Sequence, residues 1–239
     1  MEQHHPIPVA WFDFEATGLA PFDKNNVKVV EVAVSIREGD TQAQRRNWDT
    51  LVYPDRAIPI ESSNIHGILD RHVEGKPTFA EIADTLYALM HNKIWAGHNV
   101  RKYDIPLLLR EYKLCQKKPP LCLGIIDTLE IANEAFRGRA NLQDCKLQTL
   151  CHYADIIAPG AVQRHRAATD VELTIKLCKF MASQLYMEYR YPALKRQLPV
   201  EDTVVVVPKT THSVLEIKKE EPGVSIEPGA KQARTKQAA

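Results

Sequence analysis

Residues 9–18 read Val-Ala-Trp-Phe-Asp-Phe-Glu-Ala-Thr-Gly, and this stretch decides the fold. The run is apolar, as is typical of a β-strand, and it ends at a glycine. Because side chains alternate along a strand, Asp13 and Glu15 share one face of it. Phe12 and Phe14 then point to the other face, into a core. Two carboxylates held side by side repel each other unless a cation lies between them, and Mg²⁺ or Mn²⁺ prefers such oxygen ligands. Taken alone, the pattern favours a strand whose acidic side chains simply face water.

The bulk composition predicts a globular protein of balanced charge. The chain has 239 residues, enough to bury a full core, and one domain of about 200 residues is the natural expectation. Lys and Arg total 31 while Asp and Glu total 30, so binding of nucleic acid would require local placement of basic residues. The five cysteines are odd in number and lack the spacing of a zinc site, which favours reduced thiols. With no signal pattern and no apolar run of membrane length, we expect a soluble intracellular protein of the cytoplasm or nucleus.

The segments after the opening strand predict an α/β fold. Strands over 27–36 and 46–53 complete an antiparallel meander, with the acidic strand at its centre. Residues 64–68 are expected to form a polar connection. Helix and strand patterns then alternate, which favours a sheet flanked by helices with its site at the strand ends. The later elements are a helix from the capping box at Thr78 to Met90, a strand over 93–96, a helix from Asp104, a strand over 121–126, a helix over 147–153 and a long helix over about 167–189.

The folded domain is expected to span residues 7–192. The character of the chain changes after it, because residues 200–239 contain no aromatic residue and several prolines. We predict that these residues form a flexible tail. Short patterns over 204–207, 217–220 and 233–237 resemble protein-interaction sequences, so a partner bound by the tail is one hypothesis and a plain flexible segment is the other.

Acidic residues recur at two later places in the chain. Residues 98–104 read His-Asn-Val-Arg-Lys-Tyr-Asp and directly follow an apolar strand, whereas residues 165–170 read His-Arg-Ala-Ala-Thr-Asp and open the long helix. Taken singly, Asp104 fits an acid at a helix N-terminus, Asp170 fits a solvated helix residue, and His165 fits a surface histidine. Their joint occurrence with the opening strand is what indicates chemistry.

The ordered pattern resembles the DEDDh family of 3′-to-5′ exonucleases, also called DnaQ-like or RNase T/DNA polymerase III epsilon-like. That family has a strand with Phe-Asp-x-Glu-x-Thr-Gly, then His-Asn followed by Phe or Tyr and Asp, and finally His-x₄-Asp. All three motifs occur here in order, and the resemblance covers about residues 8–185. Three residues separate Asn99 from Tyr103 where many members have two, and Ala16 stands where threonine is common. The resemblance implies a ribonuclease H-like fold, in which an antiparallel meander plus parallel strands form a mixed sheet flanked by helices.

The resemblance also implies a two-metal site for phosphodiester hydrolysis. Asp13, Glu15 and Asp170 would be direct ligands of two Mg²⁺ or Mn²⁺ ions, with Asp13 bridging both, and Asp104 would hold the second ion. His165 would be the general base, a role that suits its unperturbed pKa of about 6.5. Ions about 3.5–4 Å apart stabilise both the attacking and the leaving oxygen of an in-line displacement.

Substrate contacts are expected around the first two motifs. The backbone amides of Thr17 and Gly18 are candidates for binding the terminal 3′ hydroxyl. Leu19 is a candidate for packing against the last base, although ordinary core packing explains it equally well. His98 and Asn99 are candidates for contacting the terminal phosphate or orienting the site. Less specific candidates are Phe22 for stacking and Arg101, Lys102, Arg164 and Arg166 for neutralising phosphates.

The predicted activity is therefore metal-dependent 3′-to-5′ exonuclease action on single-stranded 3′ ends. DNA is favoured over RNA, but the motifs do not separate the two sugars, which depends on contacts to the 2′-hydroxyl. The alternative is a non-catalytic module that uses the same fold to bind nucleic acid or protein. The intact set of four carboxylates and one histidine argues against it, because a binding module has no physical need for all five. The oligomeric state stays open.

Overall fold

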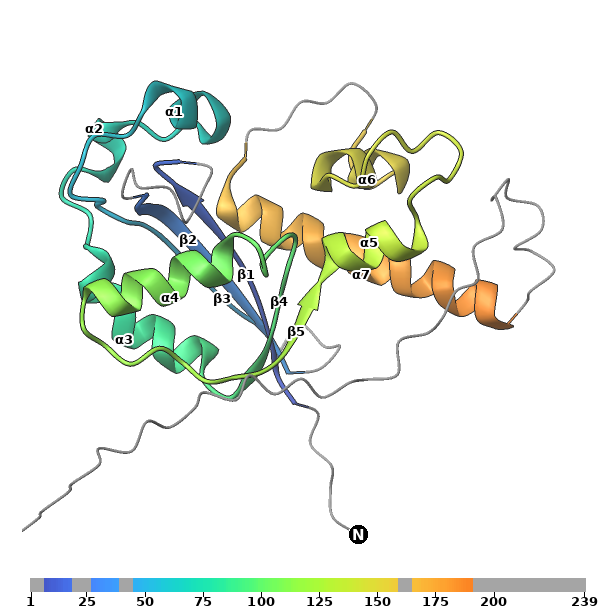
Figure 1. Cartoon of the computed structure of the whole chain (residues 1–239), viewed down its shortest axis with the longest axis horizontal. Helices are drawn as coiled ribbons and strands as arrows, with labels where there is room; N and C mark the ends of the chain where they lie inside the picture. The colour runs from blue at the N-terminus through green and yellow to red at the C-terminus, as the bar shows by residue number, and fades with distance from the viewer. Residues whose placement is uncertain (1–6, 19–26, 39–44, 159–164, 191–239) are drawn as a thin grey trace, which may run out of the picture. The chain divides into compact units, whose positions relative to one another are not determined.

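Five strands form one mixed sheet in the computed structural model, which describes residues 7–18, 27–38, 45–158 and 165–190 (Figure 1). The predicted tail and three candidate contacts, Leu19, Phe22 and Arg164, lie outside these residues. The strands are β1 (Val9–Ala16), β2 (Val29–Arg37), β3 (Arg45–Leu51), β4 (Lys93–Gly97) and β5 (Cys122–Asp127). The helices are α1 (Ile60–His66), α2 (Asp70–Val73), α3 (Phe79–Met90), α4 (Asp104–Leu114), α5 (Thr128–Ala135), α6 (Leu147–Tyr153) and α7 (Ala167–Arg190).

The acidic strand β1 lies at the centre of the sheet, whose order is β3-β2-β1-β4-β5. It pairs antiparallel with β2, and β2 pairs antiparallel with β3. On its other side β1 pairs parallel with β4, and β4 pairs parallel with β5. This arrangement confirms the predicted mixed sheet, with an antiparallel meander and parallel strands joined at β1.

Helices cover both faces of the sheet (Figure 1). Phe12 and Phe14 of β1 pack with residues of α3 and α4 in the largest apolar cluster, as the alternation of the strand predicted. The opposite face presents Trp11 and Ala33 to α7. The helices α5 and α6 pack against α7 in a further apolar cluster around Leu177. The face of β1 that carries Asp13 and Glu15 is therefore the face toward α7, since residues at i and i+2 share one side of a strand.

Three short helices, α1, α2 and α5, were not predicted from the sequence. Residues 64–68 do not form only a polar connection, because they include the end of α1, which stops at Gly67 with a left-handed φ of 74°. Helix α5 was not predicted, and it begins where the carboxylate of Asp127 caps it by accepting the N–H of Leu129 at 3.0 Å. The buried residues of α1 and α5 are polar or small, so no apolar period marks these helices, whereas the equally short α6 buries Leu147, Leu150 and Cys151 and was predicted.

Gly97 ends β4 at a point of close approach to the central strand. A Cβ atom there would lie 2.8 Å from the carbonyl oxygen of Phe12 and 2.2 Å from a methyl of Val100. We expect Gly97→Ala to lower the free energy of unfolding by about 1–3 kcal/mol, because the backbone must shift to admit the methyl group. Denaturant unfolding measures this, with Gly124→Ala on β5 as the matched control, since its Cβ would meet only Ile94 at 3.9 Å. Equal losses for the two variants would contradict the packing argument.

All five cysteines are free thiols, and Cys145 and Cys151 are buried in the cluster formed by α5, α6 and α7. None of the helices in the described part of the chain is long and apolar enough to cross a membrane.

Candidate active site

The central strand presents two carboxylates toward α7 at its carboxyl end. Asp13 is partly buried, and Glu15 is buried with 8% of its surface exposed. The pairing of β1 with β2 changes register directly after Glu15, because Glu15 lies opposite Glu31 whereas Ala16 lies opposite Val29. Irregularities of this kind are common beside active sites, where they re-aim side chains.

The second acidic motif docks onto the first through Asp104 and its neighbour. Asp104 opens α4, is buried, and its Oδ1 accepts the backbone N–H of Phe14 at 2.9 Å. The hydroxyl of Tyr103 donates to the carbonyl of Gly18. Residues some ninety positions apart in sequence are thus held together.

The third motif reaches the same place from the start of α7. Nδ1 of His165 lies 3.1 Å from Oδ2 of Asp170, which is buried. The other oxygen of Asp170, Oδ1, is buried and has no hydrogen-bond partner among the described residues. Ligand atoms of Glu15, His165 and Asp170 all lie within 4.8 Å of one another. The solvated helix residue that Asp170 resembles when taken alone is therefore a buried member of the site.

Burial and mutual repulsion raise the pKa values of the carboxyl groups. Burial raises the pKa of Asp13 well above its ordinary value, and the charges of Asp104, Glu15 and Asp170 raise it further. Burial and the charge of Asp170 raise the pKa of Glu15 to about 8. The pKa of Asp104 is likewise raised by burial, although the hydrogen bond from Phe14 opposes this. Carboxylates that all ionise in so small a volume require a positive charge among them.

The pKa of His165 is also raised, which for an imidazole favours the charged form. Its hydrogen bond with Asp170 raises the pKa of the imidazole above the ordinary value, while burial lowers it. The side chain remains 45% exposed, so one edge of the ring faces solvent. A hydrogen bond that holds Nδ1–H on Asp170 leaves Nε2 free to accept a proton.

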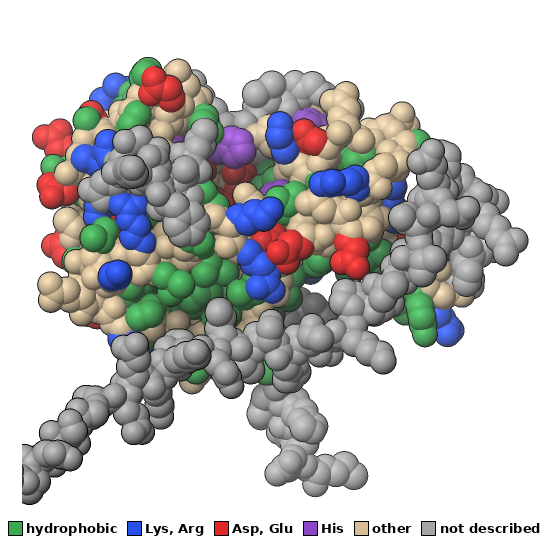
Figure 2. All heavy atoms as spheres, viewed as in Figure 1, with side chains coloured by type: hydrophobic (Ala, Val, Ile, Leu, Met, Phe, Trp, Pro, Cys, Tyr) green, Lys and Arg blue, Asp and Glu red, His purple; other side chains and the backbone are tan. Residues whose placement is uncertain are grey.

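The donor set fits a divalent cation. The unpartnered Oδ1 of Asp170 and the carboxylate of Glu15 are hard oxygen ligands converging on one point. A cation there would satisfy the buried oxygen and offset the repulsion that raises the pKa of Asp13. Glu15, Asp170 and Asp13 are thus the residues that would hold it, with Asp104 beside them. On the face shown in Figure 2, acidic and histidine side chains lie in a hollow with Lys and Arg side chains around it.

The structure gives His98 and Asn99 positions that are tied to β5 and α5. Nδ1 of His98 lies 2.9 Å from the hydroxyl of Thr128. Asn99 has a left-handed φ of 63°, a conformation that asparagine tolerates well, and its N–H donates to Asp127 at 2.8 Å. The other oxygen of Asp127 accepts the N–H of Arg101 at 3.0 Å. Asp127 therefore shapes the loop that leads to Asp104, a role that the sequence signals only as an acid directly after an apolar strand.

The residues proposed to contact the 3′ end and the phosphates are partly engaged within the fold. The N–H of Thr17 donates to the carbonyl of Lys28 at 2.8 Å, so this amide is occupied within the fold. Gly18, the next residue, carries the other backbone amide proposed to bind the 3′ hydroxyl. Arg101 pairs with Glu130 at 3.0 Å and Arg166 pairs with Glu31 at 2.6 Å. Glu31 was not among the predicted site residues, because nothing in the valine-rich sequence around it shows that this acid is buried.

Raised carboxyl pKa values make the stability of the metal-free protein depend on pH. Between the ordinary pKa of 4.5 and the folded value of about 8, the folded state holds more protons at Glu15 than the unfolded state does. Stability must therefore fall as the pH rises through this window, and a cation that binds the ionised form must reverse the loss. We expect Mn²⁺ to raise the melting temperature far more at about pH 8.5 than at about pH 5.5, relative to EDTA.

Thermal unfolding at both pH values, with and without Mn²⁺, measures this effect. Glu15→Gln is the matched variant, because it keeps the shape of the side chain and removes the ionisation. It should flatten the pH dependence in EDTA and reduce the stabilisation by Mn²⁺. A stabilisation by Mn²⁺ that is equal at both pH values, or unchanged in Glu15→Gln, would show that the cation binds elsewhere.

The chain matches known exonucleases in sequence. Residues 10–178 match the family model RNase T, described as exonuclease. The chain is 32% identical to Protein NEN2 of Arabidopsis thaliana over 187 residues, which cover 77% of this chain and 37% of that protein. It is 30% identical to DNA polymerase III subunit epsilon of Treponema pallidum over 174 residues, which cover 73% of this chain and 76% of that protein. The matched parts of NEN2 and of the related NEN1 are only 37% and 40% of those plant proteins.

Solved structures show the same fold at low sequence identity. Exonuclease X in complex with 5′ overhanging duplex DNA aligns with a TM-score of 0.53 and 21% identity, covering 73% of this chain and 92% of that one. The E. coli ExoI–ssDNA complex aligns with a TM-score of 0.60 and 17% identity, covering 80% of this chain and 42% of that one. These likenesses confirm the ribonuclease H-like fold. Since the family match extends over residues 10–178 and includes every predicted carboxylate and His165, the chain belongs to the RNase T family of exonucleases, as the DEDDh-like motifs predicted.

Proposed function

We propose that this chain is a metal-dependent 3′-to-5′ exonuclease that hydrolyses phosphodiester bonds at single-stranded 3′ ends, with DNA preferred over RNA. The observation that carries the proposal is the convergence of three separate motifs on one place, where β1, the start of α4 and the start of α7 meet. Ligand atoms of Glu15, Asp170 and His165 lie within 4.8 Å of one another, and the charge of Asp104 raises the pKa of Asp13. Such a set suits two Mg²⁺ or Mn²⁺ ions, held by Asp13, Glu15, Asp104 and Asp170.

The proposed reaction follows from what each side chain can do. Bound divalent cations would lower the pKa of a water molecule and offset the charge that develops on the phosphate. His165 accepts the proton of the attacking water at Nε2, while Asp170 holds its Nδ1–H and thereby fixes the ring. The water oxygen bonds to the phosphorus that joins the last two nucleotides, and the bond from this phosphorus to O3′ of the preceding nucleotide breaks. That O3′ takes up a proton and stays on the shortened strand as its new 3′ hydroxyl, and the terminal nucleotide leaves as a 5′-monophosphate.

The proposed substrate contacts lie next to the first two motifs. Gly18 offers a backbone amide near the terminal 3′ hydroxyl, with Thr17 fixing its position through two hydrogen bonds to Lys28. Leu19 would pack against the last base, and His98 and Asn99 would orient the loop next to the phosphate. Two of the similar solved structures are named as complexes of an exonuclease with DNA, and this similarity supports the proposed preference for DNA.

A single assay tests the proposal. The purified chain is incubated with 5′-labelled single-stranded DNA, RNA of the same sequence and blunt duplex DNA, in Mg²⁺, Mn²⁺ or EDTA. We expect a ladder of products shortened from the 3′ end, formed fastest on single-stranded DNA and absent in EDTA. Faster shortening of RNA would reassign the substrate class. Binding of the oligonucleotides with no shortening under any metal would favour the non-catalytic module instead.

A further inference from the structure

A buried acid that takes no part in the proposed chemistry lies directly beside the site. Glu31 of β2 is opposite Glu15 of β1 in the antiparallel pair, and only 3% of it is exposed. Like charges that are directly opposite across two strands are destabilising. The charge of Glu31 also raises the pKa of Glu15 and that of Asp13. A buried carboxylate in this position therefore needs a compensating interaction.

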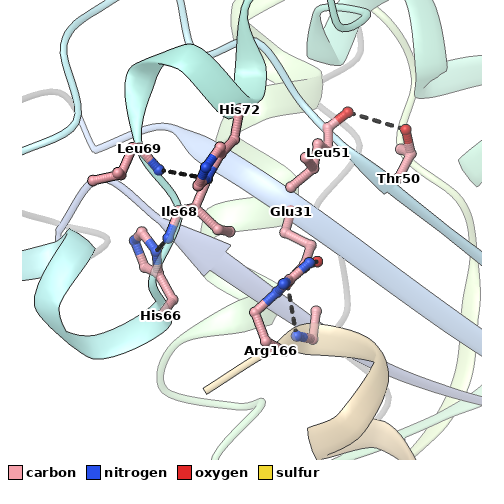
Figure 3. Close-up of polar contacts among 9 residues, drawn as sticks. Glu31, Thr50, Leu51, His66, Ile68, Leu69, His72 and Arg166 are labelled. Carbon is pink, nitrogen blue, oxygen red and sulfur yellow. Dashed lines mark hydrogen bonds and ion pairs between the residues drawn. The ribbon is translucent and has the colours of Figure 1, made fainter. Parts of the chain in front are cut away.

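Among the described residues, the hydrogen bonds to the carboxylate of Glu31 come from Arg166 and Ala167 at the start of α7. The guanidinium of Arg166 donates from Nη2 to Oε1 of Glu31 at 2.6 Å and from Nε to both carboxylate oxygens at 3.1 Å. The backbone N–H of Ala167 donates to Oε2 at 2.9 Å. Figure 3 shows Glu31 pointing from its strand to Arg166 at the beginning of the helix. Charge-assisted bonds of this forked kind are among the strongest in proteins, and a carboxylate at a helix N-terminus is further favoured by the helix dipole.

These contacts fix the backbone between two residues of the candidate site. His165 directly precedes Arg166, and the N–H of Asp170 donates to the carbonyl of Arg166 at 2.9 Å. We propose that Glu31 is a positioning residue, which holds the first turn of α7 so that His165 and Asp170 both face Glu15. Glu31 touches neither substrate nor metal in this role, and it acts through Arg166 and Ala167. The exonuclease readout of this inference rests on the proposed function, but its structural readouts do not.

A second ion pair between β2 and α7 provides a control that shows whether Glu31 positions the site residues or only stabilises the fold. Arg37 of β2 donates to Glu172 of α7 at 2.7 Å, farther along both elements. It joins β2 to α7 as the Glu31–Arg166 pair does, but it does not contact the residues before Ala167. Arg37→Gln is therefore the matched control for Glu31→Gln. If the Glu31 contacts served only to fasten α7 to the sheet, the two variants would behave alike.

The test combines three measurements on the full chain. In Glu31→Gln, a side-chain amide N–H₂ replaces one acceptor oxygen and faces the guanidinium, so the fork cannot form. We expect amide hydrogen exchange in residues 167–170 to quicken at least about tenfold, and Mn²⁺ affinity to fall about 10–100-fold. With an oligonucleotide substrate, kcat should fall about 10–100-fold while KM changes less than about threefold. Arg37→Gln should leave all three within about twofold of wild type.

A milder variant keeps the inference testable if Glu31→Gln does not fold. Arg166→Lys retains the positive charge but loses the planar fork, so it should show the same three effects at a smaller size. The inference is overturned if either variant lowers the melting temperature but leaves exchange at 167–170 and Mn²⁺ affinity the same as in Arg37→Gln. Should the wild-type chain shorten no oligonucleotide, the proposed function fails, and exchange and Mn²⁺ affinity still decide the role of Glu31.

Discussion

Replacing Asp13 with asparagine is expected to abolish exonuclease activity and at the same time to stabilise the metal-free protein. Asp13 lies among Asp104, Glu15 and Asp170, and burial together with their charges raises its pKa well above the ordinary value. A carboxyl whose pKa is raised on folding opposes folding when it is ionised, so a neutral side chain of the same shape relieves that cost near neutral pH. Loss of a metal ligand removes several kcal/mol of transition-state stabilisation, or about 10³-fold or more in rate.

Both halves of this result are measurable. In EDTA near neutral pH, Asp13→Asn should raise the melting temperature by about 3 °C or more, which corresponds to about 1 kcal/mol for a domain of this size. In Mn²⁺ the same variant should gain less stability than wild type and should not shorten an oligonucleotide. The control is Asp84→Asn, an exposed acid paired with Lys117, which should change neither property. Retained activity in Asp13→Asn would remove Asp13 from the ligand set, and a lower melting temperature in EDTA would contradict the repulsion described here.

Replacing His165 with alanine is expected to lower kcat by about 10²–10⁴-fold, the usual contribution of a general base. The imidazole is held at Nδ1 by Asp170 and keeps an exposed edge, which is the arrangement a proton acceptor requires. Mn²⁺ affinity should fall by a smaller factor than kcat, because the four carboxylates are all retained and only the hydrogen bond from His165 to Asp170 is lost. Titration with Mn²⁺ and single-turnover hydrolysis measure the two quantities separately.

The same variant distinguishes the base from a metal ligand. Nitrogen of His165 lies within 4.8 Å of the ligand oxygens of Glu15 and Asp170, so direct ligation is the competing role. A fall in Mn²⁺ affinity as large as the fall in kcat would assign His165 to the metal. His152→Ala is the control, since this histidine lies on α6 and belongs to no cluster of ligand atoms in the described part of the chain.

The first motif shows how much of the structure can be predicted from local sequence. Alternation along residues 9–18 placed Phe12 and Phe14 in the core and the two carboxylates on the opposite face, and the structure confirms both. The order of the three motifs likewise indicated the family. Helices α1 and α5 were harder to predict, because the residues that they bury are polar or small and give no apolar period.

Interactions between distant residues account for what could not be predicted. No local pattern distinguishes Glu31 from an acid that faces water. Its burial depends on the register of β2 against β1 and on contact with Arg166, which lies 135 residues later in the chain. For the same reason Arg166 resembles a phosphate-binding residue in sequence but is held by Glu31 in the fold. Similarly, the N–H of Thr17 is occupied by the carbonyl of Lys28, the residue before β2.

The sequence by itself determined which side chains are present and which face of the central strand carries them, because alternation is a property of the strand alone. Only the tertiary structure decided that Asp104 bonds to Phe14, that Asp170 is buried with one oxygen unpartnered, and that Glu31 holds the start of α7. These features require strand register and helix docking, which arise from contacts between segments far apart in the chain. Burial of the carboxylates also comes only with the assembled fold, and with it the raised pKa values that favour a bound cation.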